Sequence, residues 1–244
     1  PLDGGLEVSE KVDGSAHMSF GVKGGQLWTK SKNGTVKMSA DEYPDQPMFR
    51  ALKQAHWALQ ELTTKLPEGV TFASDVLYTR IPNSIEYGDN RIVVHGVSGG
   101  NGVEAKQVID QLSTQSLSDG DQNWKIEFKR VLSPDEVMVD VKEEFNSISE
   151  IYDELKRLTP NKLKAVGKGP YKAALAKFQA IQMALKKKLV GQLRGKSSAY
   201  GPEGGDVEGL VFRDLESGAM TKLVDKEYFT KLNKFLWRYR EMLY

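Results

Sequence analysis

Lys11 stands directly before an Asp-Gly turn, in the run Glu10-Lys11-Val12-Asp13-Gly14. A protonated lysine is a poor nucleophile. A lysine that lies in a cleft beside other cations and a metal ion can instead supply a neutral amine that attacks phosphorus. Asp-Gly is also an ordinary hairpin turn, so this segment alone leaves two interpretations open. Lys11 is either a nucleophile or a lysine that merely flanks a turn.

Any metal ion would have to be held by carboxylates and by ligand phosphates. The sequence has no cysteine, and its three histidines, His17, His56 and His95, are widely separated. This composition excludes disulfides, thiolate metal sites and a cysteine nucleophile, and it does not suggest a zinc cluster. Mg²⁺ or Mn²⁺ is therefore the expected ion. Glu208 is the leading candidate ligand, because the glycine after it allows close backbone approach.

The charges of the chain are segregated, although the formal net charge is only +1. Residues 155–202 contain no Asp or Glu but twelve Lys and Arg residues. A block of one sign fits a polyanion better than a solvated face, which usually mixes signs. The alternative is a lysine-rich helix that only confers solubility. The candidate nucleic-acid contacts are Lys164, Lys168, Lys172, Lys186, Lys187, Lys188, Arg194 and Lys196.

Hydrophobic patterning predicts the elements that must position these residues. Strands are expected at 6–12, 17–22, 26–30, 70–78, 91–97, 124–128, 208–213 and 219–224. Helices are expected at 47–66, 103–112, 141–158 and 171–189, and an amphipathic helix is expected at the end of the chain. The first three strands read as an antiparallel meander, because Asp-Gly, Gly-Gly and Asn-Gly pairs punctuate them.

The order of these elements predicts an α+β domain: an antiparallel-sheet core with a basic helical insertion at about 133–200. The chain of 244 residues is 39% hydrophobic, which allows one large domain. No stretch reaches the roughly 20 apolar residues that cross a bilayer, and no secretory signal is evident. We therefore expect a monomer without membrane contact in the cytoplasm of a bacterial cell or a phage-infected host.

Several ordered segments resemble the covalent nucleotidyltransferase superfamily of ATP-dependent polynucleotide ligases and capping enzymes. Lys11-Val12-Asp13-Gly14 matches the first motif of that superfamily. The run Lys30-Ser31-Lys32 resembles the motif that follows, in the form seen in phage-type RNA ligases. The strands around Asp75 and His95 fall where the superfamily places its sugar-binding acid and its base-stacking ring. Two further matches are Glu208-Gly209-Leu210-Val211-Phe212 and the segment from Thr221 to Lys226.

The resemblance implies an ATP-grasp-like ligase core over the whole chain and a role for each residue. Lys11 would carry AMP, while Lys222 and Lys226 would supply cations to the α-phosphate. Lys30 and Lys32 would meet phosphates from the other side. Glu208 would hold Mg²⁺ or Mn²⁺. The remaining nucleotide contacts would be Asp75 to the ribose, His95 to the face of adenine and Glu10 to the base amine. Asp75 replaces the usual glutamate, and the spacing of Lys222 and Lys226 departs from the usual lysine pair.

The substrate class stays open at this stage. An RNA ligase is favoured, because Gly14-Ser15 lacks the arginine that DNA ligases place shortly after the glycine. The adenylyltransferase domain of a DNA ligase, acting on ends or nicks, is the alternative, and a capping guanylyltransferase is less favoured. A binding module that has lost its chemistry is the non-enzymatic alternative. The sequence after Lys226 is too short for an OB-fold, so we expect either a piece of a longer ligase or a compact one.

Overall fold

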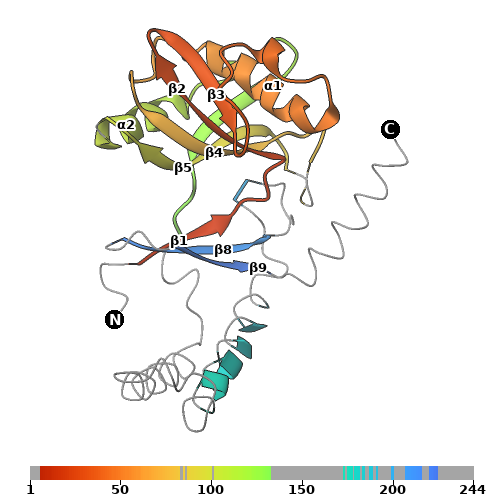
Figure 1. Cartoon of the computed structure of the whole chain (residues 1–244), viewed down its shortest axis with the longest axis vertical. Helices are drawn as coiled ribbons and strands as arrows, with labels where there is room; N and C mark the ends of the chain where they lie inside the picture. The colour runs from red at the N-terminus through yellow and green to blue at the C-terminus, as the bar shows by residue number, and fades with distance from the viewer. Residues whose placement is uncertain are drawn as a thin grey trace.

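The computed structural model describes residues 6–82, 85, 87–100, 102–132, 173, 175–177, 179–181, 183–184, 187–188, 191, 199–200, 207–215 and 220–224. Within this part of the chain, the strands form two separate sheets, and the α-helices α1 and α2 accompany the larger one (Figure 1). The larger body lies above the smaller sheet in that view, and β1 runs from one toward the other. The expected α+β class is therefore confirmed for the described residues.

The larger sheet has six strands in the order β3-β2-β4-β5-β7-β6. Its strands are β2 (Ala16–Lys23), β3 (Gln26–Ser31), β4 (Thr71–Leu77), β5 (Asn90–Ser98), β6 (Leu117–Ser118) and β7 (Asn123–Phe128). Two α-helices, α1 (Pro47–Gln60) and α2 (Gly102–Leu112), accompany it, together with the short 3₁₀ helix η1 (Ala40–Glu42). Helix α1 begins at a proline in its first turn, where a missing N–H costs nothing.

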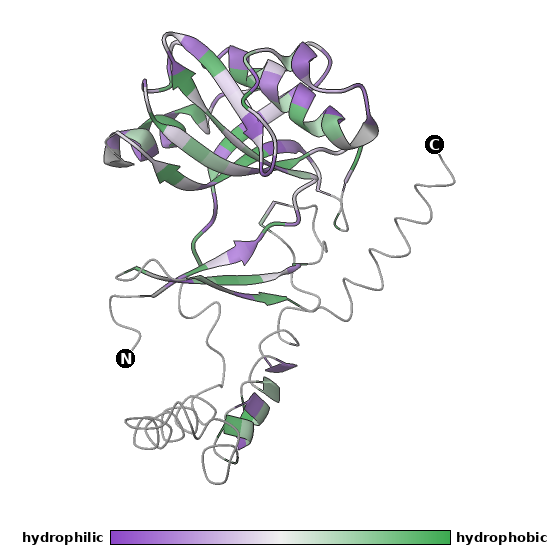
Figure 2. Ribbon diagram, in the orientation of Figure 1, coloured by the Kyte–Doolittle hydropathy of each residue, from purple (hydrophilic) through white to green (hydrophobic). Residues whose placement is uncertain are grey.

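One face of this sheet forms the hydrophobic core. Alternate strand residues such as Phe20, Phe72, Ile92 and Ile126 are fully buried there, against Ala55 and Leu59 of α1 and Ile109 of α2. In Figure 2 hydrophobic and hydrophilic segments alternate along both helices, as expected for helices that cover one face of a sheet. Because side chains alternate along a strand, the residues between these positions point to the opposite face.

The smaller sheet has three antiparallel strands in the order β1-β8-β9. They are β1 (Leu6–Lys11), β8 (Gly209–Asp214) and β9 (Met220–Val224). The register sets Lys11 opposite Gly209, and Gly209 opposite Val224. Two segments separated by nearly the whole chain therefore meet at the end of β1, where Lys11 lies.

Two expectations about strand pairing are wrong. β1 does not join an antiparallel meander with β2, because it pairs with β8 instead. The turn after it is no hairpin: the backbone N–H of Ser15 donates to the carbonyl of Val76 on β4, which carries the chain across to the larger sheet. That sheet is also not wholly antiparallel, since β5 and β7 run parallel. Helix α2 lies between these two strands in the sequence and makes the crossover that parallel strands need.

The predicted helical insertion at about 133–200 lies largely outside the described residues, so it stays a prediction. Between 173 and 191, the residues that the structure describes are helical. The predicted helices at 141–158 and at the end of the chain also lie outside the described part. None of the helices in that part is long and apolar enough to cross a membrane.

Candidate active site

Lys11 and Glu208 lie against each other at the junction of the two sheets. Lys11 Nζ donates a hydrogen bond to Glu208 Oε2, and 197 residues of sequence separate the two. Both side chains are mostly shielded from water, with exposed fractions of 22% for Lys11 and 11% for Glu208. The end of β1 and the residue before β8 thus bring a candidate nucleophile and a candidate metal ligand into direct contact.

Close backbone packing explains the two glycines beside this pair. A Cβ atom at Gly14 would lie 2.9 Å from the Cβ of Asp75. A Cβ atom at Gly209 would lie 2.0 Å from the carbonyl oxygen of Leu223 on β9. Neither position has room for a side chain, because contacts this short do not occur between real Cβ atoms and backbone. The glycines therefore let Lys11 and Glu208 approach the residues around them.

Asp13 fixes the loop that follows Lys11. Its buried carboxylate accepts a hydrogen bond of 3.0 Å from the backbone N–H of Ile85. Its own backbone N–H donates to the hydroxyl of Tyr87 at 2.8 Å. The Asp-Gly pair is therefore not a simple hairpin turn. It anchors the end of β1 to the segment before β5.

The six-stranded sheet contributes an acid and two rings on the face opposite its core. His17 on β2 pairs in register with Asp75 on β4. The ring centroids of His17 and His95 are 5.3 Å apart, and His95 Nε2 lies 3.8 Å from Asp75 Oδ2. Burial, opposed by the nearby charges of His17, Lys11 and Lys222, raises the pKa of Asp75. Asp75 and His95, which were predicted from separate strands, thus lie together.

The β4–β5 register slips beside His95, which lies on this face because it alternates with buried Val94. Ala73 pairs with Gly96 and Ser74 pairs with Val94, so His95 has no residue opposite it. Such a bulge bends the strand and redirects one side chain, and bulges recur beside active sites. Burial, together with the charges of Lys129 and Lys222, lowers the pKa of His95 to about 4. The ring is therefore neutral at pH 7, and no ion pair forms with Asp75 there.

The candidate phosphate-binding lysines enter the site from both sheets. Lys222 on β9 pairs with Val211, two residues from the Gly209 that faces Lys11, so Lys222 and Lys11 share one face of the smaller sheet. The charges of Lys32 and Lys222 both act on the pKa of His17, which burial chiefly lowers. Lys30 pairs with Ser19, two residues from His17, and so lies on the same face as His17. Lys226 lies outside the described residues.

Glu208 has an environment suited to a bound cation. Burial raises the pKa of its carboxyl to about 7; the hydrogen bond from Lys11 opposes this rise, while Asp13 and Asp75 add to it. Among the described residues, no group of three or more His, Asp or Glu side chains could hold a metal ion by itself. Mg²⁺ is often bound through one or two carboxylates together with substrate phosphates. One carboxylate among other acids and phosphate-binding lysines fits that arrangement.

A cavity of about 600 Å³ opens beside His95, at the ends of β5 and β7. Its walls combine the apolar side chains of Val97 and Phe128 with the charged groups of Glu7, Lys129 and Arg213. Lys129 also bonds to Glu7, which joins β1 to the residue after β7. The cavity therefore lies where β1 and β8 of the smaller sheet approach β5, β7 and α2 of the larger body, and His95 lines it.

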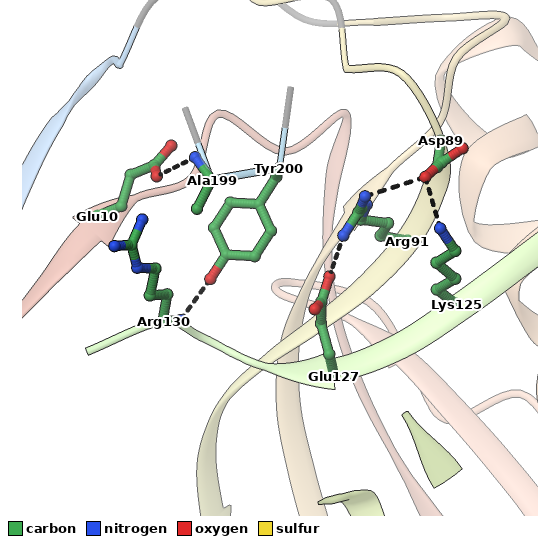
Figure 3. Close-up of polar contacts among 8 residues, drawn as sticks. All are labelled: Glu10, Asp89, Arg91, Lys125, Glu127, Arg130, Ala199 and Tyr200. Atoms are coloured by element: carbon green, nitrogen blue, oxygen red, sulfur yellow. Dashed lines mark hydrogen bonds and ion pairs between the residues drawn. The ribbon is translucent and has the colours of Figure 1, made fainter. Parts of the chain in front are cut away.

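Glu10 lies differently from the other predicted nucleotide contacts. It is buried, and its Oε2 accepts a hydrogen bond of 3.0 Å from the backbone N–H of Ala199 (Figure 3). Of the eight predicted nucleic-acid contacts, only Lys187 and Lys188 fall within the described residues, and both are helical, with Lys187 exposed. The other six lie outside.

Two residues of the site were not predicted from the sequence. His17 was noted only as one of three scattered histidines, yet it pairs with Asp75 and approaches His95. Strand alternation offered a signal, because His17 and Ser19 occupy the face opposite buried Met18 and Phe20. The second is Tyr200, which is buried beside Val12 and whose hydroxyl accepts a hydrogen bond from the backbone N–H of Arg130. Tyr200 gave no comparable signal, since it follows a lysine-rich run far from β1 in the sequence.

Comparisons with known proteins concern the fold. Neither family models nor curated protein sequences match this chain. The structure is similar to a mutant RNA ligase of Naegleria gruberi with ATP and Mn, at 10% sequence identity and a TM-score of 0.46. A second Naegleria gruberi mutant with AMP and Mn gives 12% identity and a TM-score of 0.46. In both cases the match covers 93% of this chain and 51% of the other.

A putative ATP-dependent DNA ligase from Aquifex aeolicus matches over 79% of this chain and 60% of its own, with 10% identity and a TM-score of 0.24. The chain thus spans about half the length of the Naegleria ligase chains. At sequence identities this low, the matches concern only the fold. Any activity of this chain has to be derived from the side chains of its site.

Proposed function

We propose that this chain is the nucleotidyltransferase core of an ATP-dependent polynucleotide ligase. The observation that carries the proposal is the contact between Lys11 and Glu208, two shielded side chains brought together from opposite ends of the sequence. Around this pair lie an acid, a neutral ring and further lysines. A merely structural ion pair would not need these phosphate- and base-binding groups beside it.

The first chemical step is attack of Lys11 on the α-phosphorus of ATP. A bond forms between Nζ and phosphorus, the bond from that phosphorus to the pyrophosphate oxygen breaks, and pyrophosphate leaves. Lys11 is held by Glu208 in the described state. The neutral amine can therefore act only when that contact is released and the proton of Lys11 is lost.

Lys222, Lys30 and Lys32 would neutralise charge that develops on the phosphate oxygens. Lys226 is a further candidate for this role. Glu208, with the phosphates of the nucleotide, would hold Mg²⁺ or Mn²⁺, and such an ion supplies further charge neutralisation when bound. The lysines come from both sheets, so the spacing of the sheets decides whether they meet one phosphate group.

The other end of the site would bind the nucleoside. The neutral ring of His95 can stack on a base without carrying charge, and the cavity beside it offers apolar and polar walls. Asp75 can accept a hydrogen bond from the ribose. Glu10 remains a candidate contact of the base amine, provided that it exchanges its bond to Ala199 for a bond to the ligand.

In the steps that follow, AMP passes from Lys11 to a 5′-phosphate end, and a 3′-hydroxyl then displaces it to seal the strand. We propose RNA as the substrate, because Gly14-Ser15 and Lys30-Ser31-Lys32 are of the RNA ligase form. The acid-free lysine and arginine run would bind the strand through its phosphates.

The test is intact mass after incubation with Mg²⁺ and ATP, with GTP in parallel. Wild type should gain one AMP, and Lys11→Ala should gain none. Lys23→Ala is a matched lysine control outside the site, because Lys23 is exposed at the end of β2, and it should be charged like wild type. No adduct with either nucleotide, on folded protein that is not already charged, would remove the proposal and favour the binding module. Sealing of nicked RNA against nicked DNA then decides the substrate.

A further inference from the structure

Tyr200 lies where the two sheets approach each other, and its contacts reach both (Figure 3). The side chain is 3% exposed. Its hydroxyl accepts a hydrogen bond from the backbone N–H of Arg130, just after β7. The guanidinium carbon of Arg91 on β5 lies 6.0 Å from the centroid of its ring, within the range of a cation–π contact. The larger sheet thus holds Tyr200 by its ring and by its hydroxyl.

The smaller sheet contacts the same short segment. Ala199, the residue before Tyr200, donates its backbone N–H to Glu10, the neighbour of Lys11 on β1. Tyr200 also belongs to a buried cluster with Val12 and Val93, against which Val224 of β9 packs. The cluster that contains Tyr200 therefore includes the residue after β1 and a residue of β5, and a residue of β9 packs against it.

Arg91 gives this ring a fixed support. Its Nη1 donates to Glu127 Oε1 at 2.6 Å, and its Nη2 donates to Asp89 Oδ2 at 2.9 Å. Asp89 accepts a further bond of 2.8 Å from Lys125. A guanidinium held by two carboxylates has little freedom to follow a moving ring. Tyr200 therefore rests on a rigid part of the larger sheet and not on a flexible side chain.

We infer that Tyr200 is a positioning residue that sets the separation of the two sheets beside the site. It thereby sets how far Lys11 and Lys222 on one sheet lie from Asp75 and His95 on the other. Its effect on catalysis rests on the proposed nucleotidyl transfer, whereas its effect on the spacing of the sheets does not. The two effects are therefore tested by separate measurements.

Spacing can be measured directly, because the chain has no cysteine of its own. Cysteines introduced at Gln111 on α2 and at Met220 on β9, both exposed, would carry spin labels on the two sides of the junction. Pulsed electron paramagnetic resonance should show a longer or broader distance distribution in Tyr200→Ala than in the labelled parent. Tyr200→Phe keeps the ring and should stay close to the parent.

Two further variants distinguish a local effect of Tyr200 from a general loss of folding. Leu62→Ala removes a fully buried side chain from the core of the larger sheet, in a different buried cluster from Tyr200, and should leave the distance distribution unchanged. Tyr200→Leu keeps apolar bulk without the ring and serves where the alanine variant does not fold. The same distribution in Tyr200→Ala, or in Tyr200→Leu, as in the parent would overturn the inference.

The rate of Lys11 charging provides the second readout. At saturating ATP and well below the unfolding temperature, Tyr200→Ala should be slowed about 10-fold to 100-fold, the size of effect expected from a small misplacement of reacting groups. Leu62→Ala should charge at the rate of wild type, and Tyr200→Phe should recover most of it. Equal charging by wild type and Tyr200→Ala would refute the positioning role. A wild type that takes up no nucleotide would refute the proposed function, and the distance measurement would still decide the spacing.

Discussion

Burial and the contact with Lys11 act in opposite directions on the pKa of Glu208. Burial disfavours the ionised form of Glu208 and raises its pKa, and the ammonium of Lys11 opposes that rise. In the proposed reaction, the Glu208 carboxylate has to exchange Lys11 for another partner before the Lys11 amine can react. The pair therefore holds a resting state, and a divalent cation that binds the carboxylate would favour release of the amine.

His95 gives a prediction at the same scale. If its neutral ring stacks on the base, His95→Ala should raise the KM for ATP in Lys11 charging by roughly 2-fold to 10-fold, the worth of an aromatic contact. The charging rate at saturating ATP should change little, because the ring does not touch the phosphates. His95→Phe should restore the KM. An alanine variant with the KM of wild type would contradict the stacking role.

At the scale of elements, the strand–strand contact behind Glu208 is unusually tight. Gly209 lies between Lys11 on β1 and Val224 on β9, and its position leaves no space for a methyl group. Because Lys222 lies two residues before Val224, a shift of β9 would also displace a candidate phosphate ligand. Stability and activity are thus linked at this glycine.

Gly209→Ala should therefore lower the free energy of unfolding by about 1–3 kcal/mol, the usual cost of forcing extra atoms into a packed site. Thermal or urea unfolding measures the change. Gly191→Ala is the matched control: Gly191 lies in a helical segment with open space around it, and alanine there should be neutral or stabilising by up to about 1 kcal/mol. A smaller loss at Gly209 than at Gly191 would count against the tight packing.

The same elements show which features of the fold could be predicted from the sequence. Alternating hydrophobic residues predicted all the described strands except the two-residue β6, because burial on one face imposes that pattern. The pairing of β1 could not be predicted, since alternation is identical whichever strand lies beside it. The parallel β5–β7 pair was missed for the same reason.

The site was predicted in its residue types but not in its geometry. Ordered motifs singled out Lys11, Asp75, His95 and Glu208, and the structure brings these four to one junction. His17 was missed because only register shows that it pairs with Asp75. The bulge beside His95 depends on a slipped pairing between two strands, which no local pattern records. Tyr200 depends on long-range packing in the same way.

At the scale of the whole molecule, a buried histidine links folding to pH. His56 of α1 is fully buried, and its Nδ1 lies 2.7 Å from the hydroxyl of Thr29 on β3. Its Nε2 has no hydrogen-bond partner among the described residues. Burial lowers its pKa below the value of 6.5 that an unfolded chain has. Below that pH the unfolded chain takes up a proton that the folded protein resists.

The contribution of neutral His56 to the free energy of unfolding should accordingly be fully present above about pH 6.5. It should decline as the pH falls, by at most about 1.4 kcal/mol per pH unit. Urea unfolding between pH 7.5 and pH 5 measures the decline. His56→Gln keeps a partner for Thr29 but does not titrate, so its decline should be shallower. Some slope should remain, because the pKa values of His17 and His95 are lowered too. Parallel curves for the two proteins would exclude His56 as a cause.

The pairing of β1 with β8 also governs the order in which the molecule can form. All six strands of the larger sheet lie between Ala16 and Phe128, so that sheet can assemble while the rest of the chain is still being synthesised. β1 precedes that sheet in the sequence and bridges Val131 through Ser9, but its partner strand β8 follows only at residues 209–214. Closing so long a loop is slow, and Lys11 meets Glu208 only in that last step. Nascent chains that stop before Glu208 therefore lack both the partner of Lys11 and the partner strand of β1, and cannot contain the assembled pair.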